Sequence, residues 1–454
     1  MTKFDRGSMR KFLVLGIAYT VTVLAFYFLD NFAEIAQGNR FLRGINPAAL
    51  LFQKAVTSGF KKPRNNYVVL VLLDDKVPQA TRDNLCLQRR YVAEVVDRIS
   101  HACPAAIALD LTFSQETCPQ TNPDLYQSTV ELQRAIAAVP RTIPVVIAQR
   151  TIDATYMLKK SPQKLADLRD HHGFKDSEVI LEPQVAFDST DRNKVTLGLY
   201  TFNEDRRKVP LSWSAYSSLD TVGNEKPTAI DTFSVAVAKA FRPDPRIISQ
   251  IRTFQDHDSH PLTSFLTQRE ILCFSAFDIL AGGTHASLSQ EKCRSTDTDT
   301  DPLEQINHRI VVIGKDDPRI DRWDSVIGEV PGAVLQANYI ESILDSRLLK
   351  PVEGWLSVVA ALAWLGLIEV IFRLWANNPH RAVLTAFLAT AVVWVLLYDV
   401  ALMQWGYYLV LWPPSIVAIL WRYVLLLSER KRGHTGNARA ERGQVEIKEA
   451  TAND

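Results

Sequence analysis

Six aspartates lie at or just beyond the ends of segments that the sequence predicts to be buried strands. They are Asp74, Asp75, Asp110, Asp316, Asp317 and Asp321. In a doubly wound sheet, ligands lie beyond the carboxyl ends of the strands. Carboxylates there could hold a divalent cation or accept hydrogen bonds from a small ligand. These six residues are therefore the candidate ligand-binding set, and the alternative is that they cap helices and loops.

Other signatures of catalysis are missing from the sequence. It contains no G-x-S-x-G motif, no G-x-x-x-x-G-K-[ST] phosphate loop and no H-E-x-x-H zinc motif. No two cysteines are spaced as C-x-x-C, which argues against a zinc or redox centre of that type. We therefore expect a protein that is not an enzyme, with no catalytic residue and no cofactor. The sequence leaves a metal at the aspartates undecided.

Apolar runs define the elements that must position these aspartates. Three of them, at 67–75, 105–113 and 143–149, are rich in β-branched residues and predict strands buried on both faces. Segments 88–102 and 122–139 lie between them and carry apolar residues at helical spacing. This β-α-β-α-β order predicts an α/β domain with a mostly parallel sheet and flanking helices.

The rest of this region is less regular. The alternation in "KVTLGLYTFNEDRRKVPLSW" suggests a hairpin around 203–206, and 229–241 predicts a helix. The stretch "HRIVVIGKDD" predicts another buried strand that ends at Gly314, and a helix over 332–349 is expected to run directly into the next hydrophobic segment. Both halves of the region are therefore expected to contribute strands to one sheet.

Four hydrophobic segments predict membrane crossings, one N-terminal and three C-terminal. Lys3, Arg6, Arg10 and Lys11 precede the first segment, and the positive-inside rule then places both termini in the cytoplasm of a multi-pass inner-membrane protein. Three charges, Glu369, Asp399 and Arg422, lie inside the spans near their ends, where neighbouring helices can pair them. The expected organisation is a cytoplasmic N-terminus at 1–11, an anchor at 12–29, an extracytoplasmic domain at 30–350, transmembrane helices at 355–372, 382–403 and 407–427, and a cytoplasmic tail at 428–454.

All five cysteines fall in the predicted extracytoplasmic domain, where disulfides can form. Cys86 and Cys118 follow successive strands and are the first candidate pair. Cys273 and Cys293 are the second. The odd number leaves one cysteine over, and the sequence leaves the connectivity open.

The order of several motifs resembles the type-two CHASE family, an extracellular sensing domain associated with cyclases and histidine kinases. The matching stretches are "VVLVLLDD", "AIALDLTFS", "GLYTFNEDRRKVPL", "FSAFDILAGG" and "RIVVIGKDDPRIDRWDS…EVPGAVLQANYIESIL". The resemblance implies an N-terminal anchor, a sensing domain and three C-terminal membrane helices, in that order. Two positions depart from the family pattern. Gln336 replaces a frequent histidine, and an aromatic-proline motif is reduced to "LQRRYVAEV".

Family members usually continue into a kinase or cyclase, whereas here a short tail follows the last hydrophobic segment, so we expect a stand-alone form. The expected function is a membrane receptor that senses an extracytoplasmic signal and relays it to a separate protein. The alternative is a non-signalling scaffold or envelope assembly component. The expected partners are the lipid bilayer, a small ligand or protein signal outside, a membrane or cytoplasmic output protein, and a second copy of the chain. The net charge of +1 gives no sign of a nucleic-acid partner.

Overall fold

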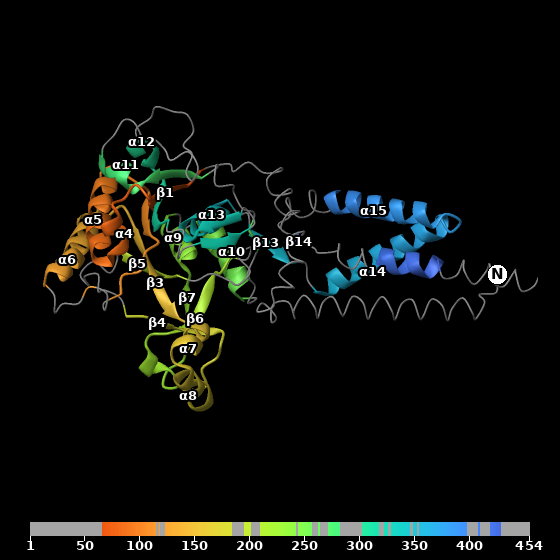
Figure 1. Cartoon of the computed structure of the whole chain (residues 1–454), viewed down its shortest axis with the longest axis horizontal. Helices are drawn as coiled ribbons and strands as arrows, with labels where there is room; N and C mark the ends of the chain where they lie inside the picture. The colour runs from red at the N-terminus through yellow and green to blue at the C-terminus, as the bar shows by residue number, and fades with distance from the viewer. Residues whose placement is uncertain are drawn as a thin grey trace, which may run out of the picture. The chain divides into compact units, whose positions relative to one another are not determined.

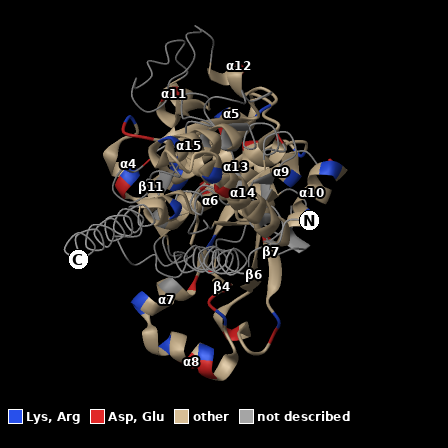
Figure 2. Cartoon of the chain, turned by 90° about the vertical axis from the view of Figure 1, so that its right-hand side faces the viewer, with Lys and Arg blue, Asp and Glu red and all other residues tan. Residues whose placement is uncertain are grey.

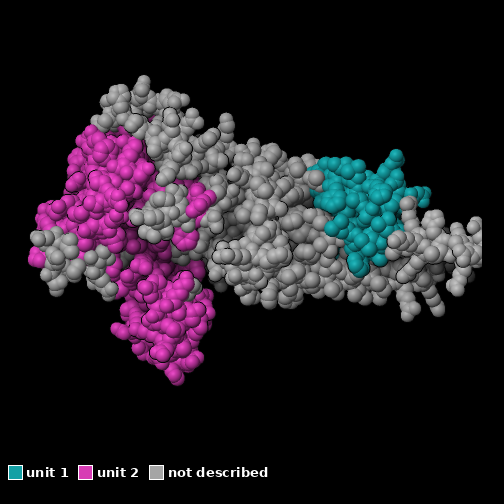
Figure 3. Space-filling view, viewed as in Figure 1, with its two compact units in different colours: residues 1–49, 350–454 teal, residues 50–349 magenta. Residues whose placement is uncertain are grey.

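A computed structural model describes fifteen ranges of the chain, which fall into two compact units. Unit 1 comprises residues 1–49 and 350–454, and unit 2 comprises residues 50–349 (Figure 3). The predicted anchor at 12–29 and the tail after 427 lie outside the described residues. Those residues are 66–114, 118, 123–183, 195–200, 209–241, 244–256, 262–263, 271–281, 302–316, 322–325, 328–345, 348–351, 354–396, 407–408 and 418–427.

Unit 2 is built on a sheet whose central strands are parallel, as the sequence predicted. The strand order is β3-β2-β10-β1-β9, and each neighbouring pair is parallel. All residues of β1 and β2 are buried, which explains their continuous apolar sequences. Because β10 lies between β1 and β2, both halves of the chain share this sheet. The bounds are β1 Val68–Leu73, β2 Ala106–Leu109, β3 Val145–Ile152, β9 Leu272–Ser275 and β10 Ile310–Lys315.

Helices cover both faces of this sheet (Figure 1). One face packs against α5 (Leu85–Ser100), α6 (Pro123–Ala138), α11 (Ala276–Ala281) and α12 (Pro302–Ile306). The other packs against α9 (Phe233–Phe241), α10 (Pro245–Asp256) and α13 (Gly332–Leu344). A short helix, α4 (Gln79–Asp83), precedes α5. The predicted helices at 88–102 and 122–139 correspond to α5 and α6, whereas strand β7 (Thr228–Asp231) takes the first residues of the segment at 229–241, which continues as α9.

The start of α5 illustrates how local sequence defines an element. The side chain of Asn84 accepts hydrogen bonds from the N–H groups of Cys86 and Leu87, which is the usual helix N-cap arrangement. Val92, Val96 and Ile99 then recur at helical spacing and are fully buried against the sheet.

Helix α13 lies within the core, because all thirteen of its residues are buried. It packs so closely on β10 that a Cβ added at Gly314 would collide with the Cβ of Ala333. Only glycine fits at this strand position unless the helix moves. Gly314 therefore sets the distance between the helix and the strand.

The predicted hairpin around 203–206 is wrong, although its two arms are strands. Strand β5 (Val195–Tyr200) pairs parallel with β3, whereas β6 (Ser212–Tyr216) pairs with β4 (Glu178–Leu181) and β7 (Thr228–Asp231). Alternating apolar residues identify a strand but not its partner. Tertiary packing decided the partner here, since Gly198 of β5 is pressed against the backbone of Phe233 in α9.

Strands β4, β6 and β7 continue into a small lobe with a core of its own. The lobe includes α7 (Ala154–Lys160) and α8 (Pro162–His172), and its core contains Leu165, Leu168 and Phe174. Acidic and basic residues alternate along α8, so neither sign of charge gathers there (Figure 2). A short 3-10 turn, η3 (Leu219–Thr221), also contributes.

The predicted helix at 332–349 is too long. It ends at Leu344, where the N–H of Asp345 donates to the carbonyl oxygens of Glu341 and Ile343. A strand, β13 (Leu348–Pro351), follows and pairs with β8 (Leu262–Thr263). The expected direct run from this helix into the next hydrophobic segment is therefore wrong, because β13 intervenes. A separate hairpin, β11 (Arg322–Ser325) with β12 (Gly328–Pro331), precedes α13.

The described part of unit 1 consists mainly of three helical segments. They are α14 (Gly354–Leu374), α15 (Pro379–Leu396) and a helix over 418–427. An apolar core that includes Ile368, Phe372 and Ile419 joins them. The predicted span at 407–427 begins differently from the prediction, because Tyr407–Tyr408 form strand β14.

In the ranges that the structure describes, no helix combines the length and apolarity that a membrane crossing requires. The four crossings therefore stay predictions.

Candidate ligand site at the carboxyl edge of the sheet

Three of the six predicted aspartates come together at the carboxyl ends of the central strands, which we call the carboxyl edge of the sheet. Asp110, Asp316 and Asp74 directly follow β2, β10 and β1, which are adjacent parallel strands. The N–H of Asp110 donates to the carbonyl oxygen of Ile313 (2.8 Å), and that of Asp316 donates to Leu73 (3.2 Å). The hydrogen-bond ladder between the parallel strands therefore includes Asp110 and Asp316. Their order along the carboxyl edge follows the order of the strands.

All three carboxylates are buried. The exposed fractions are 9% for Asp74, 7% for Asp110 and 3% for Asp316. A carboxylate removed from water is costly unless hydrogen bonds or nearby positive charge compensate it. Aspartates that only cap loops do not need to be buried in this way. The burial of these three carboxylates is therefore compatible with a ligand-binding role.

Asp74 has clear hydrogen-bond partners. Its Oδ1 accepts from the hydroxyl of Ser275 at the end of β9 (2.6 Å) and from the N–H of Lys76 (3.2 Å). Burial raises the pKa of Asp74 above its ordinary value, although both hydrogen bonds act in the opposite direction. Ser275 is therefore a fourth member of this edge.

Asp110 faces the side of the sheet that α13 covers. Its Cβ and Oδ2 lie 3.6 Å from the point that a Cβ of Gly314 would occupy, and Ala333 in the first turn of α13 borders the same point. The first turn of a helix carries unsatisfied N–H groups and partial positive charge. This part of the edge thus combines buried acids with a helix N-terminus.

On the opposite face of the sheet from α13, the carboxyl edge is bordered by α5 and α11. Lys76 forms an ion pair with Asp278 of α11 (2.7 Å). The pKa of Tyr91 in α5 rises to about 12, mainly because its hydroxyl is buried, with further contributions from Asp74, Glu94 and Asp278. The phenol therefore stays neutral and can serve as a hydrogen-bond donor at physiological pH.

The other predicted residues have different outcomes. Asp75 is exposed. Asp317 and Asp321 lie outside the described residues. Within the described part of the chain, no three acidic, histidine or cysteine residues are arranged to hold a metal ion.

Sequence reasoning assigned no role to Ser275, Lys76, Tyr91 or Asp278. Their involvement depends on β9 pairing with β1, which brings residues about two hundred positions apart into contact. The sequence signals are two stretches quoted for the family resemblance: "FSAFDILAGG" contains Ser275 and Asp278, and "LQRRYVAEV" contains Tyr91.

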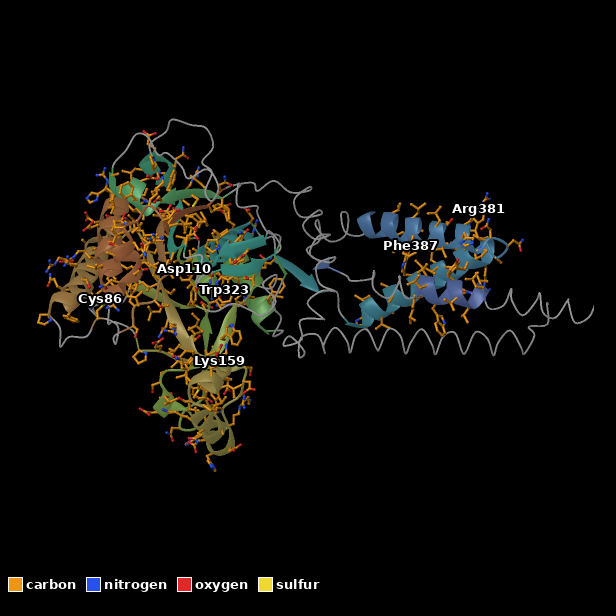
Figure 4. All side chains as sticks on the ribbon, in the orientation of Figure 1. Cys86, Asp110, Lys159, Trp323, Arg381 and Phe387 are labelled. Atoms are coloured by element: carbon orange, nitrogen blue, oxygen red, sulfur yellow. A yellow bond between two sulfur atoms is a disulfide. The ribbon has the colours of Figure 1, made fainter. Side chains whose placement is uncertain are left out.

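A disulfide and a buried arginine attach the chain that follows Asp110 to α5. Cys86 at the start of α5 is bonded to Cys118, with a Cα–Cα distance of 5.8 Å. Arg89, which is 2% exposed, donates to the carbonyl oxygen of Ser114 (2.5 Å) and to the hydroxyl of Thr129 (2.6 Å). Both attachments hold this chain against α5 (Figure 4 labels Cys86 and Asp110).

The remaining cysteines are partly described. Cys273 is disulfide-bonded, and its predicted partner Cys293 lies outside the described residues. Cys103 is a free cysteine, and it is exposed.

Comparisons with known proteins give one match. A family model described as the CHASE2 domain matches residues 18–370. No curated protein and no solved structure gave a significant match to the chain.

Proposed function

Because the chain belongs to the CHASE2-domain family, we propose that it is an integral membrane receptor that senses an extracytoplasmic signal and has no enzymatic activity of its own. CHASE2 is a sensory domain, and unit 2 contains most of the matched residues. In this proposal, the carboxyl edge of the sheet receives the signal. A partner protein in or at the inner membrane then receives it from unit 1.

The observation that carries the membrane part of the proposal is the surface of unit 1. Large apolar side chains are exposed along α14 and α15, including Trp355 (64%), Leu374 (76%) and Leu384 (61%). Phe387 and Arg381 mark α15 in Figure 4. Soluble proteins rarely expose contiguous apolar surface of this kind, and large patches mark membrane or protein interaction sites. A lipid environment, with a partner helix on part of the surface, would cover it.

The charges inside unit 1 also support this proposal. Glu369 of α14 forms an ion pair with Arg422 (2.9 Å) and another with Arg373 one turn away (3.1 Å). The side chains of Glu369 and Arg422 are only 14% and 13% exposed. Charged residues that face the interior of a helical bundle and pair with one another are typical of membrane helices.

The native thiol of Cys103 provides a test of the proposed orientation. It is free and exposed in unit 2, so a membrane-impermeant maleimide should label it in intact spheroplasts. Cys103→Ser should abolish this labelling. Asn437→Cys in the Cys103→Ser background should react only after the membrane is opened, because the tail is proposed to be cytoplasmic.

Two results would overturn the orientation. One is labelling of Cys103 only after the spheroplasts are lysed, and the other is labelling of position 437 from outside. Recovery of the chain in the soluble fraction would overturn the membrane proposal altogether.

A further inference from the structure

Strand β13 belongs to both units. The unit boundary falls between Leu349 and Lys350, in the middle of its four residues. Leu348 and Leu349 pair antiparallel with Thr263 and Leu262 of β8, within unit 2. The second half pairs parallel within unit 1, where Lys350 and Pro351 face Tyr407 and Tyr408 of β14.

The first half of β13 is anchored in the core of unit 2. Leu348 is 2% exposed and belongs to the apolar cluster that surrounds α13. The buried carboxylate of Glu341, near the end of α13, accepts a hydrogen bond from the N–H of Val68 in β1 (2.7 Å). The strand therefore follows a helix that is fully buried and bonded to the central sheet.

The second half of β13 has much weaker support. Its pairing with β14 comprises two residue pairs, and Pro351 has no N–H to donate. An isolated pairing this short would be marginally stable at best in water. The β13–β14 pairing therefore depends on β13 being held in an extended conformation by its first half.

We propose that β13 transmits a change in unit 2 to strand β14 of unit 1. This inference rests on the proposed receptor function. When β13 is paired with β8, its backbone is fixed and can also pair with β14. When the β8 pairing is lost, the β14 pairing is lost with it. Strand pairing changes in discrete steps rather than gradually, so β13 can act as a two-state link.

Hydrogen exchange of the full chain in nanodiscs tests this coupling. Leu348→Ala removes the buried side chain that anchors β13. We expect at least tenfold faster exchange both at residues 262–263 and at residues 407–408. Leu168→Ala is the matched control, because Leu168 is also buried in unit 2 (5% exposed) but lies in the core of the small lobe. It should leave exchange at 407–408 unchanged.

A disulfide cross-link tests the same coupling by strengthening the β8–β13 pairing. It also avoids the cavity that Leu348→Ala creates. Leu262 and Leu349 are register partners in the β8–β13 pair, so Leu262→Cys with Leu349→Cys, in the Cys103→Ser background, should form a disulfide. Exchange at 407–408 should then slow at least threefold relative to the Leu262→Ser, Leu349→Ser protein.

The proposal is overturned if Leu348→Ala leaves exchange at 407–408 unchanged, or if the cross-link fails to slow it. Neither measurement depends on which side of the membrane unit 2 occupies. A failure of the coupling can therefore be distinguished from a failure of the receptor topology, which the labelling of Cys103 decides.

Discussion

At the scale of single residues, Asp74 shows most directly what burial does to a carboxylate at the carboxyl edge of the sheet. Its carboxylate is buried beside Ser275 and Lys76, and burial raises its pKa. Such a residue gains or loses a proton at a pH where exposed aspartates do not change. The stability of unit 2 should therefore depend on the protonation of this one group.

We expect Asp74→Asn to remove part of the pH dependence of unfolding. The folded protein holds the Asp74 proton to higher pH than the unfolded chain does. Its contribution to stability is therefore complete below the unfolded pKa, near 3.8, and is lost as the pH rises through the raised folded pKa. The free energy of unfolding of the Asn variant, relative to wild type, should rise across that window in urea titrations. Parallel curves for Asp74→Asn and wild type would contradict the assignment.

Ser275→Ala should destabilise unit 2 through the same carboxylate. The hydroxyl donates to Asp74 at 2.6 Å, and a hydrogen bond to a charged group contributes about 1.5–3 kcal/mol. Its loss should also raise the pKa of Asp74 further, because this bond opposes the effect of burial. The expected result is lower stability at neutral pH with less loss at acid pH, measured by urea unfolding at several pH values. Ser275→Thr, which keeps the hydroxyl, should restore most of the difference.

Gly314→Ala should destabilise unit 2 because its Cβ collides with that of Ala333. Overpacking of a core typically costs about 1–3 kcal/mol. Ala333→Gly on its own should cost about 1 kcal/mol through helix propensity. The two changes together should be less destabilising than the sum of the single changes, because the second removes the colliding atom. Additive effects in thermal unfolding would show that α13 and β10 are not in close contact.

Among the structural elements, the chain between β2 and α6 is the one most dependent on added restraints. The Cys86–Cys118 disulfide joins residues 32 positions apart and ties this chain to α5, and Arg89 of α5 donates a further hydrogen bond to the carbonyl oxygen of Ser114. Since Asp110 begins this segment, its restraints also affect the carboxyl edge. Losing them should disturb the site before it disturbs the central strands.

Replacing Cys86 and Cys118 by serine should lower the free energy of unfolding by about 2–4 kcal/mol, which is the typical effect for a loop of this length. Hydrogen exchange in the segment that follows Asp110 should increase, whereas exchange in β1 and β10 should change only in proportion to global stability. Cys103→Ser, at the free cysteine, is the control and should leave stability unchanged. Equal effects of the two variants would exclude a structural role for the disulfide.

In unit 1, the corresponding restraint is the ion pair between α14 and the helix at 418–427. Glu369→Gln should leave Arg422 partly buried without its charged partner, at a cost of about 1–3 kcal/mol. Glu369→Gln combined with Arg422→Met should recover most of that stability, since no unpaired charge remains. Tryptophan fluorescence during denaturant unfolding measures the stability of the single and the double variant. A double variant that is as unstable as the single one would show that the charges are not coupled.

At the scale of the whole molecule, the proposed receptor must recruit its partner through unit 1. The exposed apolar side chains along α14 and α15 offer a contact surface for such a partner. Deleting residues 433–454 should therefore reduce co-purification of the membrane partner less than twofold. Replacing residues 354–427 by one unrelated membrane helix should abolish it. The reverse pattern would make the tail the docking segment and leave the helices as an anchor alone.

Much of unit 2 could be predicted from the sequence, because its central elements depend on local patterns. Strands β1, β2, β3 and β10 are short apolar runs buried on both faces, and α5 has both an N-cap and an apolar stripe. The position of aspartates after these runs also identified Asp74, Asp110 and Asp316 in advance. Hydrophobic periodicity depends on which face of an element is buried, so it can be read without knowing the partner.

Only the tertiary structure decided which elements are partners. The insertion of β10 between β1 and β2 places Asp316 between Asp74 and Asp110, and the pairing of β9 with β1 brings Ser275 to Asp74. The same dependence explains the two wrong predictions, since β5 pairs with β3 rather than β6, and residues 348–351 form a strand rather than the end of a helix. Strand partners are selected by long-range packing and hydrogen bonding, which a local pattern does not encode. The sequence by itself therefore determined the kinds of elements and their buried faces, whereas the tertiary structure decided the order of the strands and, with it, the composition of the site.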